Sequence, residues 1–360
     1  MTNDLCYDQR MARICGTLAN EGYLVTLVGF RKKGSLPLSN VKYYQKRLYT
    51  FFRAGPGFYA ESNIRLFFHL LFASADVYCC IDLDTIIPVW LAAVLRRKKR
   101  VIDAHEYFSQ QKEVISRPAV HRKWKWIEKT FLPKFPRGYT VSESIAAAFS
   151  QTYGLHYDVI RNVPRLKPLP AFRKTSPPTI LYQGAVNEAR GLEFLVPAMK
   201  NIDAVLVICG DGNFMKQVKE LVRVNNLEKK VFLKGNLVPD RLDLIAAEAC
   251  MGLNLVENSG LNQYYSLANK FFDYIQAGLP QVTMNFPEYS KINKEFQVAV
   301  LINDLRQETI AGALNTLLND EALYNSLRNN CIRAREVLNW QKEEKVLSAF
   351  YNALFEGEVN

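Results

Sequence analysis

Three polar side chains near residue 270 are of the types that hold a nucleotide. Asn269, Lys270 and Asp273 come early in a stretch, Leu267 to Gly278, whose apolar residues recur at helical spacing. Residues three and four apart lie near one another on a helix surface. Free N–H groups at a helix start, together with a lysine, suit a phosphate, and a carboxylate one turn deeper suits the two hydroxyls of a ribose. An amphipathic helix with solvated polar positions is the alternative explanation of the same pattern.

The limits of this helix are also predicted by its residue types. Ser266 is expected to be the N-cap, because its hydroxyl can accept from a free N–H of the first turn. Gly278 is expected to end the helix, and Pro280 prevents it from resuming.

Two glycine-containing loops precede this helix in the same half of the chain. Strand Thr179–Gln183 runs into Gly184, which lets a ligand approach the backbone, and Arg190 can fork onto phosphate oxygens. A later strand ends at Gly210, and Gly212 gives a tight turn into the next helix. Loops that follow successive parallel strands meet at one edge of a sheet, so we expect all three groups to converge on one nucleotide site.

The first half has one comparable loop. His105 and Glu106 follow a buried strand that ends at Asp103, which is the position of catalytic side chains in open parallel sheets. A hydrogen-bonded structural histidine is the alternative interpretation of His105.

The segment IDLDT contains a second pair of carboxylates. Asp82 and Asp84 form an Asp-x-Asp pattern that binds a divalent cation in some sugar transferases. Asp84 and Thr85 can equally cap a helix that starts at Ile86. Cysteine, histidine and acidic residues show no convincing metal spacing elsewhere, so we expect no metal site.

These loops need elements that hold them. Buried strands alternate with helices in both halves of the chain, which predicts an α/β protein of two Rossmann-like, doubly wound domains facing a cleft. Residues 163–178 hold five prolines and no periodicity, which is typical of a linker. We predict an N-terminal domain over residues 1–165, a linker over 166–178, a second domain over 179–338 and a C-terminal helix over 339–360 that returns to the first domain.

Charge is uneven along the 360 residues. Residues 1–170 carry 26 Lys and Arg against 13 Asp and Glu, whereas the remainder carries 20 against 22. A basic half favours an anionic partner, such as an acidic polymer, a nucleic acid or an anionic membrane surface. The stretch at 121–135, with a helix predicted over roughly 123–131, mixes basic residues with Trp124 and Trp126, which suits a membrane interface. Packing against its own domain and single-stranded nucleic acid binding are the alternatives, although no nucleic-acid module surrounds it.

The chain shows no basic-then-apolar leader and no apolar run long enough to span a membrane. Its seven cysteines include no CxxC pair, and several lie in apolar strands, so we interpret them as reduced core residues. These features predict a cytoplasmic protein that associates peripherally with the inner membrane face.

Taken in order, the motifs resemble a GT-B glycosyltransferase of the large retaining group related to family GT4. The resemblance covers nearly the whole chain and is carried by TNDLCYDQR, IDLDT, DAHEYF, YTVSES, RNVP, YQGAVNEARGLE, GDG and SLANKFFDYIQAGLP. It implies that the first domain binds the acceptor, with Asp8 and Arg10 on that side, and that the second binds a nucleotide-sugar. It also implies retention of anomeric configuration and no essential metal.

The sequence departs from the family pattern at several positions. A Glu-x7-Glu pair of the family falls on Tyr265 and Asp273, and the position after Gly184 is Ala185 where a basic residue is usual. Lys270 is expected to compensate for that missing cation. A first strand is expected before the loop at 4–10, yet only three residues precede it, so a truncated start is predicted.

The resulting hypothesis is transfer of a sugar from a nucleoside diphosphate-sugar to a glycan or lipid-linked acceptor, in cell-surface polysaccharide synthesis. His105 and Glu106 are the predicted catalytic residues. Two alternatives remain: a non-catalytic nucleotide-sugar-binding protein, and a sugar-nucleotide epimerase of the same fold. The predicted donor-binding residues are Gly184, Arg190, Gly210, Gly212, Asn269, Lys270 and Asp273.

Overall fold

The computed structural model describes residues 1–5 and 8–356. The predicted motif at 2–10 therefore lies partly outside the described residues. The chain forms two compact units. The N-terminal unit consists of Met1–Arg161, Gly260–Asn262 and the stretch from Glu343, and the C-terminal unit of Asn162–Ser259 and Gln263–Lys342.

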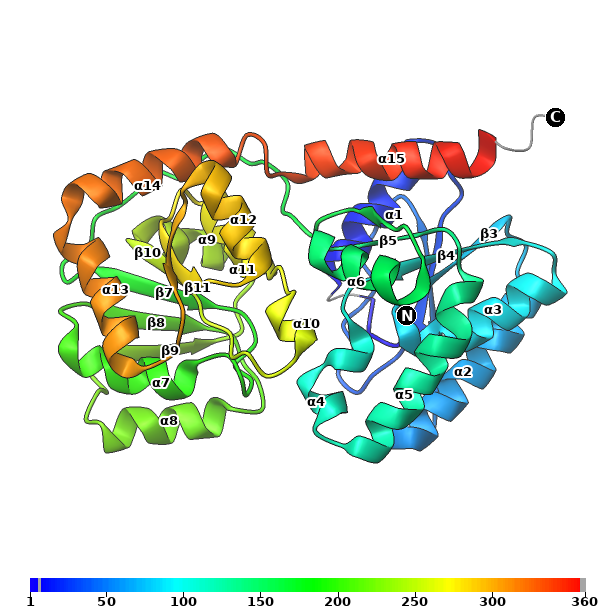
Figure 1. The fold of residues 1–360 in the computed structure, drawn as a ribbon, viewed down its shortest axis with the longest axis horizontal. Coiled ribbons are helices and arrows are strands. Elements are labelled where there is room, and N and C mark those ends of the chain that lie inside the picture. Colours follow the sequence, from blue (N-terminus) through cyan, green and yellow to red (C-terminus); the bar gives the residue numbers. More distant parts are fainter. Residues whose placement is uncertain (6–7, 357–360) are drawn as a thin grey trace. The chain divides into compact units, whose positions relative to one another are not determined.

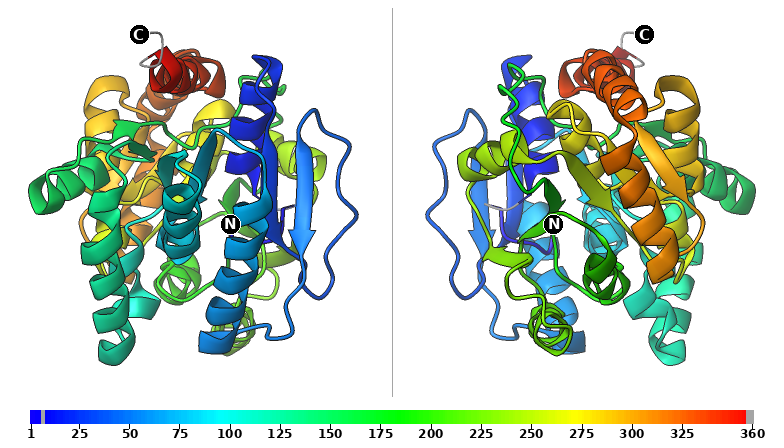
Figure 2. Two further views of the ribbon diagram at one scale, coloured as in Figure 1. Left: turned by 90° about the vertical axis from the view of Figure 1, so that its right-hand side faces the viewer. Right: turned by 90° about the vertical axis from the view of Figure 1, so that its left-hand side faces the viewer.

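The N-terminal unit contains two parallel sheets with helices packed on them (Figures 1 and 2). One sheet has the order β3-β4-β5-β6 and the other pairs β1 with β2. Its strands are β1 (Thr26–Phe30), β2 (Tyr44–Leu48), β3 (Val77–Ile81), β4 (Lys99–Ala104), β5 (Gly138–Thr140) and β6 (Asp158–Val159). Its helices are α1 (Gln9–Asn20), α2 (Gly55–Phe72), α3 (Ile86–Leu95), α4 (Lys112–Ile115), α5 (Pro118–Phe131), α6 (Glu143–Tyr153) and most of α15 (Trp340–Glu356).

The first residues of the chain pair with β1. The Met1 amino group donates to Val28 O at 3.0 Å, and Phe30 N donates to Asn3 O at 3.3 Å. The Thr2 hydroxyl donates to the carboxylate of Asp84 after β3. Residues 1–3 thus contact β1 and the turn that follows β3.

Helix α15 packs on the N-terminal unit through aromatic rings. Phe350 and Tyr351 meet Tyr139 of β5 at ring-centroid distances of 5.1 and 6.4 Å. Asn339 Oδ1 accepts from Lys342 N at 3.2 Å and caps the start of this helix.

The C-terminal unit is built on one parallel sheet of order β12-β11-β10-β7-β8-β9 (Figure 1). Its strands are β7 (Thr179–Gln183), β8 (Val205–Cys209), β9 (Val231–Gly235), β10 (Met251–Asn254), β11 (Gln281–Met284) and β12 (Ala299–Ile302). Its helices are α7 (Leu192–Ala198), α8 (Met215–Val224), α9 (Pro239–Glu248), α11 (Asn269–Gln276), α12 (Pro287–Phe296), α13 (Gln307–Asn319) and α14 (Glu321–Ala334); α10 (Leu261–Tyr264) begins in the segment assigned to the other unit.

Buried strands agree with the sequence best. The predicted strand Thr179–Gln183 coincides with β7, and the strand predicted to lead into the loop of His105 is β4. The aromatic region 43–59 forms β2 and the start of α2. It gives no clear apolar period because β2 has no buried residue: Tyr44 and Lys46 are exposed and the other three are half-buried.

Candidate active site

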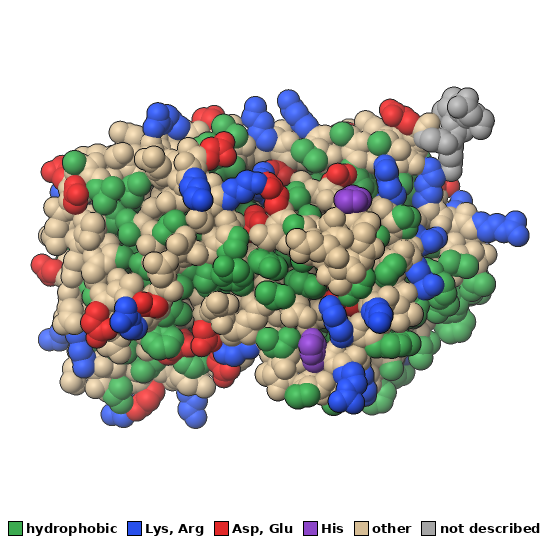
Figure 3. Space-filling view, in the orientation of Figure 1, with side chains coloured by type: hydrophobic (Ala, Val, Ile, Leu, Met, Phe, Trp, Pro, Cys, Tyr) green, Lys and Arg blue, Asp and Glu red, His purple; other side chains and the backbone are tan. Residues whose placement is uncertain are grey.

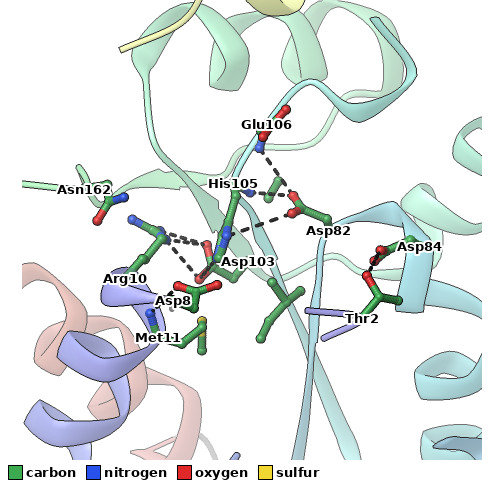
Figure 4. A network of polar contacts seen from close by, with 12 residues as sticks. Thr2, Asp8, Arg10, Met11, Asp82, Asp84, Asp103, His105, Glu106 and Asn162 are labelled. Carbon is green, nitrogen blue, oxygen red and sulfur yellow. Dashed lines mark hydrogen bonds and ion pairs between the residues drawn. The ribbon is translucent and has the colours of Figure 1, made fainter. Parts of the chain in front are cut away.

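A network of charged side chains lies at the ends of β3 and β4 in the N-terminal unit (Figure 4). Asp103 of β4 is fully buried, and Arg10 of α1 is only 1% exposed. The Arg10 guanidinium donates to Asp103 Oδ1 at 2.8 Å and to Ile160 O at 2.7 Å. In this structure Arg10 positions Asp103, and its acceptor-side role stays a prediction.

Asp8, the other predicted acceptor-side residue, is the N-cap of α1. Its Oδ1 accepts from Met11 N at 2.9 Å. The carboxylate is half-buried, and this cap fixes the start of the helix that carries Arg10.

His105 lies between two carboxylates, as Figure 4 shows. Its Nε2 is 2.9 Å from Asp103 Oδ2, and its Nδ1 is 3.9 Å from Asp82 Oδ2. Burial by itself lowers the pKa of His105, but the charges of Asp103 and Asp82 outweigh it and raise the pKa to about 9. Because Asp103 is the closer carboxylate, it carries most of that shift. His105 is therefore protonated at neutral pH, and its Nδ1–H, beyond hydrogen-bond distance of Asp82, can donate to a substrate oxygen.

Asp82 shapes the loop after β4. Its backbone has a φ of +57°, a conformation that costs a non-glycine residue energy. In return its Oδ1 accepts from His105 N at 2.7 Å and from Glu106 N at 3.3 Å. Burial raises the pKa of the Asp82 carboxyl to about 8, with the charge of His105 opposing the rise.

The other predicted roles of this segment are not supported. Thr85 Oγ1 exchanges hydrogen bonds with Ile81 and does not cap α3, so the capping prediction is wrong. Asp84 accepts from Thr2. Within residues 1–5 and 8–356, no group of three or more metal-ligating side chains is placed to hold a metal ion.

Glu106 differs from His105 in its exposure. It lies on the surface of the unit, where Oε2 accepts from Gln111 at 2.6 Å and from Asn262 Nδ2 at 3.1 Å. Asn262 also accepts from Tyr107 N at 2.9 Å. These bonds make Glu106 a support for the loop that carries His105.

Replacing Arg10 with methionine is expected to destabilise the protein by about 3 kcal/mol, because it leaves Asp103 buried with only His105 as a partner. Urea unfolding at neutral pH measures the change. The double variant Arg10→Met/Asp103→Leu should recover part of the loss, since it removes both charges. Equal losses in the single and double variants would show that the pair matters only for packing.

In the C-terminal unit, Lys270 is the central side chain. It is 8% exposed, and its Nζ has no hydrogen-bond partner among the described residues. The amine lies 3.9 Å from the centroid of the Tyr182 ring. Burial lowers the pKa of Lys270 well below 10.5, and the charge of Arg190 lowers it further, while Asp273 opposes both.

The glycines bring the loops of this unit against each other. A Cβ on Gly184 would lie 3.4 Å from Lys270 Cε, and one on Gly210 would lie 1.8 Å from Gly184 O. A Cβ on Gly212 would lie 2.3 Å from Val186 O. Only glycine permits this approach at the last two positions, so the loops after β7 and β8 form one continuous surface beside Lys270.

Asp273 and Arg190 complete this group. Gln183 Nε2, at the end of β7, donates to Asp273 Oδ2 at 2.8 Å and fixes that carboxylate. Arg190 lies in the turn before α7, flanked by Ala189 and Gly191 at φ of +61° and +69°. It has no hydrogen bond or ion pair within the described part of the chain, and its charge acts on Lys270.

Asn269 is the predicted residue that the structure does not bring to this group. It is exposed, and its Oδ1 accepts from Asn162 at 2.7 Å. Helix α11 starts at Asn269 with Ala268 as its N-cap, so the prediction that Ser266 caps it is wrong. Ser266 instead donates to Gln263 O at 2.7 Å.

Two basic side chains, Lys270 and Arg190, thus influence each other electrostatically, and the Asp273 carboxylate acts on the same amine. Such a set is suited to an anion of more than one charge. Sequence reasoning missed Asp103, Tyr182 and Gln183, which hold His105, Lys270 and Asp273. All three lie at the last or next-to-last position of a buried strand. A polar side chain at such a position is the sequence feature that could have identified them.

Two family models together match nearly the whole chain. The model of Glycosyltransferase Family 4 matches residues 9–165, and that of Glycosyl transferases group 1 matches residues 170–335. With both halves matched in this order, the chain belongs to the GT4-like group 1 glycosyltransferases. It is accordingly an enzyme that transfers a sugar from a nucleotide-sugar. No curated protein matches the sequence.

Solved structures share the fold at low sequence identity. Sucrose-phosphate synthase from Thermosynechococcus elongatus has a TM-score of 0.79 and 16% identity, over 96% of this chain and 92% of that one. Anabaena HepE in complex with UDP-glucose has a TM-score of 0.72 and 12% identity, over 98% of each chain. WaaG, a glycosyltransferase involved in lipopolysaccharide biosynthesis, has a TM-score of 0.69 and 15% identity, over 95% of each chain. These likenesses establish the GT-B fold, as the sequence predicted.

Proposed function

We propose that the protein moves a sugar from a nucleoside diphosphate-sugar to a glycan or lipid-linked acceptor with retention of configuration. We place this reaction in cell-surface polysaccharide synthesis, on the cytoplasmic side of a membrane. The observation that carries the proposal is the buried Lys270 amine beside Gly184, on which the charge of Arg190 acts. A buried amine without a hydrogen-bond partner is costly to keep, so it is expected to serve a ligand.

In this proposal the two cations bind the donor diphosphate and stabilise the charge that grows on it as the sugar departs. Asp273, held by Gln183, accepts from the ribose hydroxyls. Gly184, Gly210 and Gly212 carry no Cβ, so the phosphates can approach the backbone at these positions. The protonated His105 donates from Nδ1 to an oxygen of the transferred sugar or of the acceptor.

The anomeric configuration is retained if the acceptor oxygen attacks the anomeric carbon from the same face from which the diphosphate departs. The bond from that carbon to the phosphate oxygen breaks, and the acceptor proton passes to the departing phosphate oxygen. No protein nucleophile and no essential metal is required, because Lys270 and Arg190 carry the positive charge.

A thermal-shift panel of UDP-, GDP-, ADP- and CDP-sugars, with and without magnesium, tests the donor site. A ligand at about 100-fold over its Kd should stabilise the folded protein by about 2.7 kcal/mol. UDP-glucose is the first candidate, because the Anabaena protein of similar fold was solved with it. We expect one nucleotide to stabilise the protein without magnesium.

Asp273→Ala should remove that stabilisation, whereas Asp203→Ala, at an exposed aspartate of the same unit, should leave it intact. Stabilisation that needs magnesium would contradict metal-independent binding. Binding without transfer or hydrolysis of the donor would instead favour a non-catalytic binding protein.

A further inference from the structure

Helices α2, α3 and α5 form one layer on the N-terminal unit. Tyr59 of α2 meets Trp124 of α5 at a ring-centroid distance of 5.5 Å. Trp90 of α3 meets Phe131 of α5 at 5.4 Å. Arg96, just after α3, donates to Leu71 O near the end of α2 at 3.2 Å. The outer faces of the three helices therefore belong to one surface, which we call the α2–α3–α5 face (Figures 1 and 2).

This face exposes large apolar side chains in ordered rows. Ile64, Phe68 and Phe72 follow one another at four-residue spacing on α2, and Phe72 is 80% exposed. The adjoining α3 exposes Leu91, Val94 and Leu95, and α5 exposes Trp126 at 61%. Figure 3 shows apolar side chains gathered at the lower right rim, with Lys and Arg beside them. A row of this size on a folded unit indicates a contact surface.

Two further aromatic rings are held outward beside this row. Phe51 and Phe52 are 85% and 60% exposed, yet both of their backbone N–H groups donate to Glu61 of α2, at 2.8 and 2.9 Å. Arg65 pairs with Glu61 at 2.8 Å and lies 5.2 Å from the Phe51 ring centroid. The loop is thus fixed in a shape that presents its rings to the outside.

The charge of the face is positive. Helices α2, α3 and α5 contain only two acidic residues: Glu61, bound as above, and Glu128, which is buried and pairs with Lys125 at 2.6 Å. On α5 a shallow hollow of about 540 Å³ is lined by Trp126 together with Arg122, Lys125 and Lys129. Arg122 and Lys129 are exposed, with no hydrogen bond or ion pair to the described residues. Among those residues no helix is both long and apolar enough to cross a bilayer.

We propose that the α2–α3–α5 face docks on the surface of an anionic lipid bilayer, with the apolar rows entering the interface and the cations meeting lipid phosphates. Apolar rows next to Lys, Arg and Trp are the combination that binds such an interface. A second copy of this chain fits less well, because a twofold contact would place this basic surface against itself. The inference specifies the membrane contact of the proposed function but does not require catalysis.

Flotation of the full chain with phosphatidylcholine vesicles containing phosphatidylglycerol, in the absence of donor, tests this proposal. We expect binding that weakens with salt, and little binding to vesicles of phosphatidylcholine alone. Arg122→Gln/Lys129→Gln should weaken binding about 25-fold, at roughly fivefold for each cation. Phe68→Ser/Phe72→Ser should weaken it about tenfold.

Matched controls lie on the C-terminal unit. Lys216→Gln/Lys219→Gln and Val238→Ser/Leu244→Ser replace exposed cations and exposed apolar residues there, and both should bind vesicles as the unaltered protein does. Absence of binding to anionic vesicles would overturn the proposal. So would a dimer in sedimentation equilibrium that Phe68→Ser/Phe72→Ser converts to a monomer. The donor-induced thermal shift, measured on the same samples, shows separately whether the donor site is intact.

Discussion

Replacing Lys270 with methionine is expected to lower kcat about 10²- to 10³-fold while making the protein more stable. The loss of rate follows because a preorganised charge no longer faces the departing diphosphate. The gain in stability follows because methionine fills the same space without a buried amine that lacks a hydrogen bond. Removing such a group is worth about 1–3 kcal/mol, which for a unit of this size raises Tm by several degrees.

The stability gain should depend on pH. The folded-state pKa of Lys270 lies well below its ordinary value of 10.5. As pH falls below 10.5, the unfolded chain therefore takes up the lysine proton before the folded chain does. The advantage of Lys270→Met is therefore largest at low pH and shrinks as pH rises toward 10.5. Kinetics and urea unfolding across pH measure both effects.

Lys219→Met, at an exposed lysine of α8, is the control, and it should change neither kcat nor the pH dependence of stability. An unchanged kcat in Lys270→Met would remove the donor-site assignment. A lower stability would show that the amine has a partner in the folded protein.

The second large effect is expected at His105. Its pKa is raised to about 9 by Asp103 and Asp82 against the effect of burial, so activity that needs the imidazolium should persist to about pH 9 and fall above it. His105→Gln should lower kcat about 10²-fold, because a charged donor to the substrate is lost. In Asp103→Asn the fall should begin at lower pH, nearer 6.5, since the main source of the shift is gone.

Stability should follow the same protonation. A histidine with a raised folded-state pKa stabilises the protein fully below its unfolded pKa of 6.5, and this contribution is lost as pH rises through about 9. The shift corresponds to at most about 3 kcal/mol. Urea unfolding between those pH values should show a decline that is absent in His105→Gln.

His156→Gln, at an exposed histidine of the same unit, should keep both the activity profile and this decline. If His105→Gln keeps the full kcat but loses the decline of stability with rising pH, His105 has only a structural role. Loss of activity with an unchanged pH profile in Asp103→Asn would contradict the role of Asp103 as the group that holds the proton on His105.

The sequence by itself determined the class of fold and the loops that matter. Runs such as TILYQ at 179–183 and VLVIC at 205–209 are apolar, short and followed by glycine, so strand type and strand end could both be predicted from local pattern. The order of the motifs likewise predicted the GT-B family, because short loop motifs occupy set places along the chain.

Which side chains meet was decided only by the tertiary structure. Asp103 and Arg10 are 93 positions apart, and Gln183 and Asp273 are 90 apart, so no local period connects them. Burial, which removes solvent from Lys270 and from the carboxylates around His105, changes their pKa values and depends on packing from several elements. The sequence also placed the membrane contact on the basic stretch at 121–135, whereas our proposed surface includes the exposed rows of α2 and α3, which only the packed layer brings beside it. Sequence thus specified the elements and their loops, and packing specified the partners and the charge states.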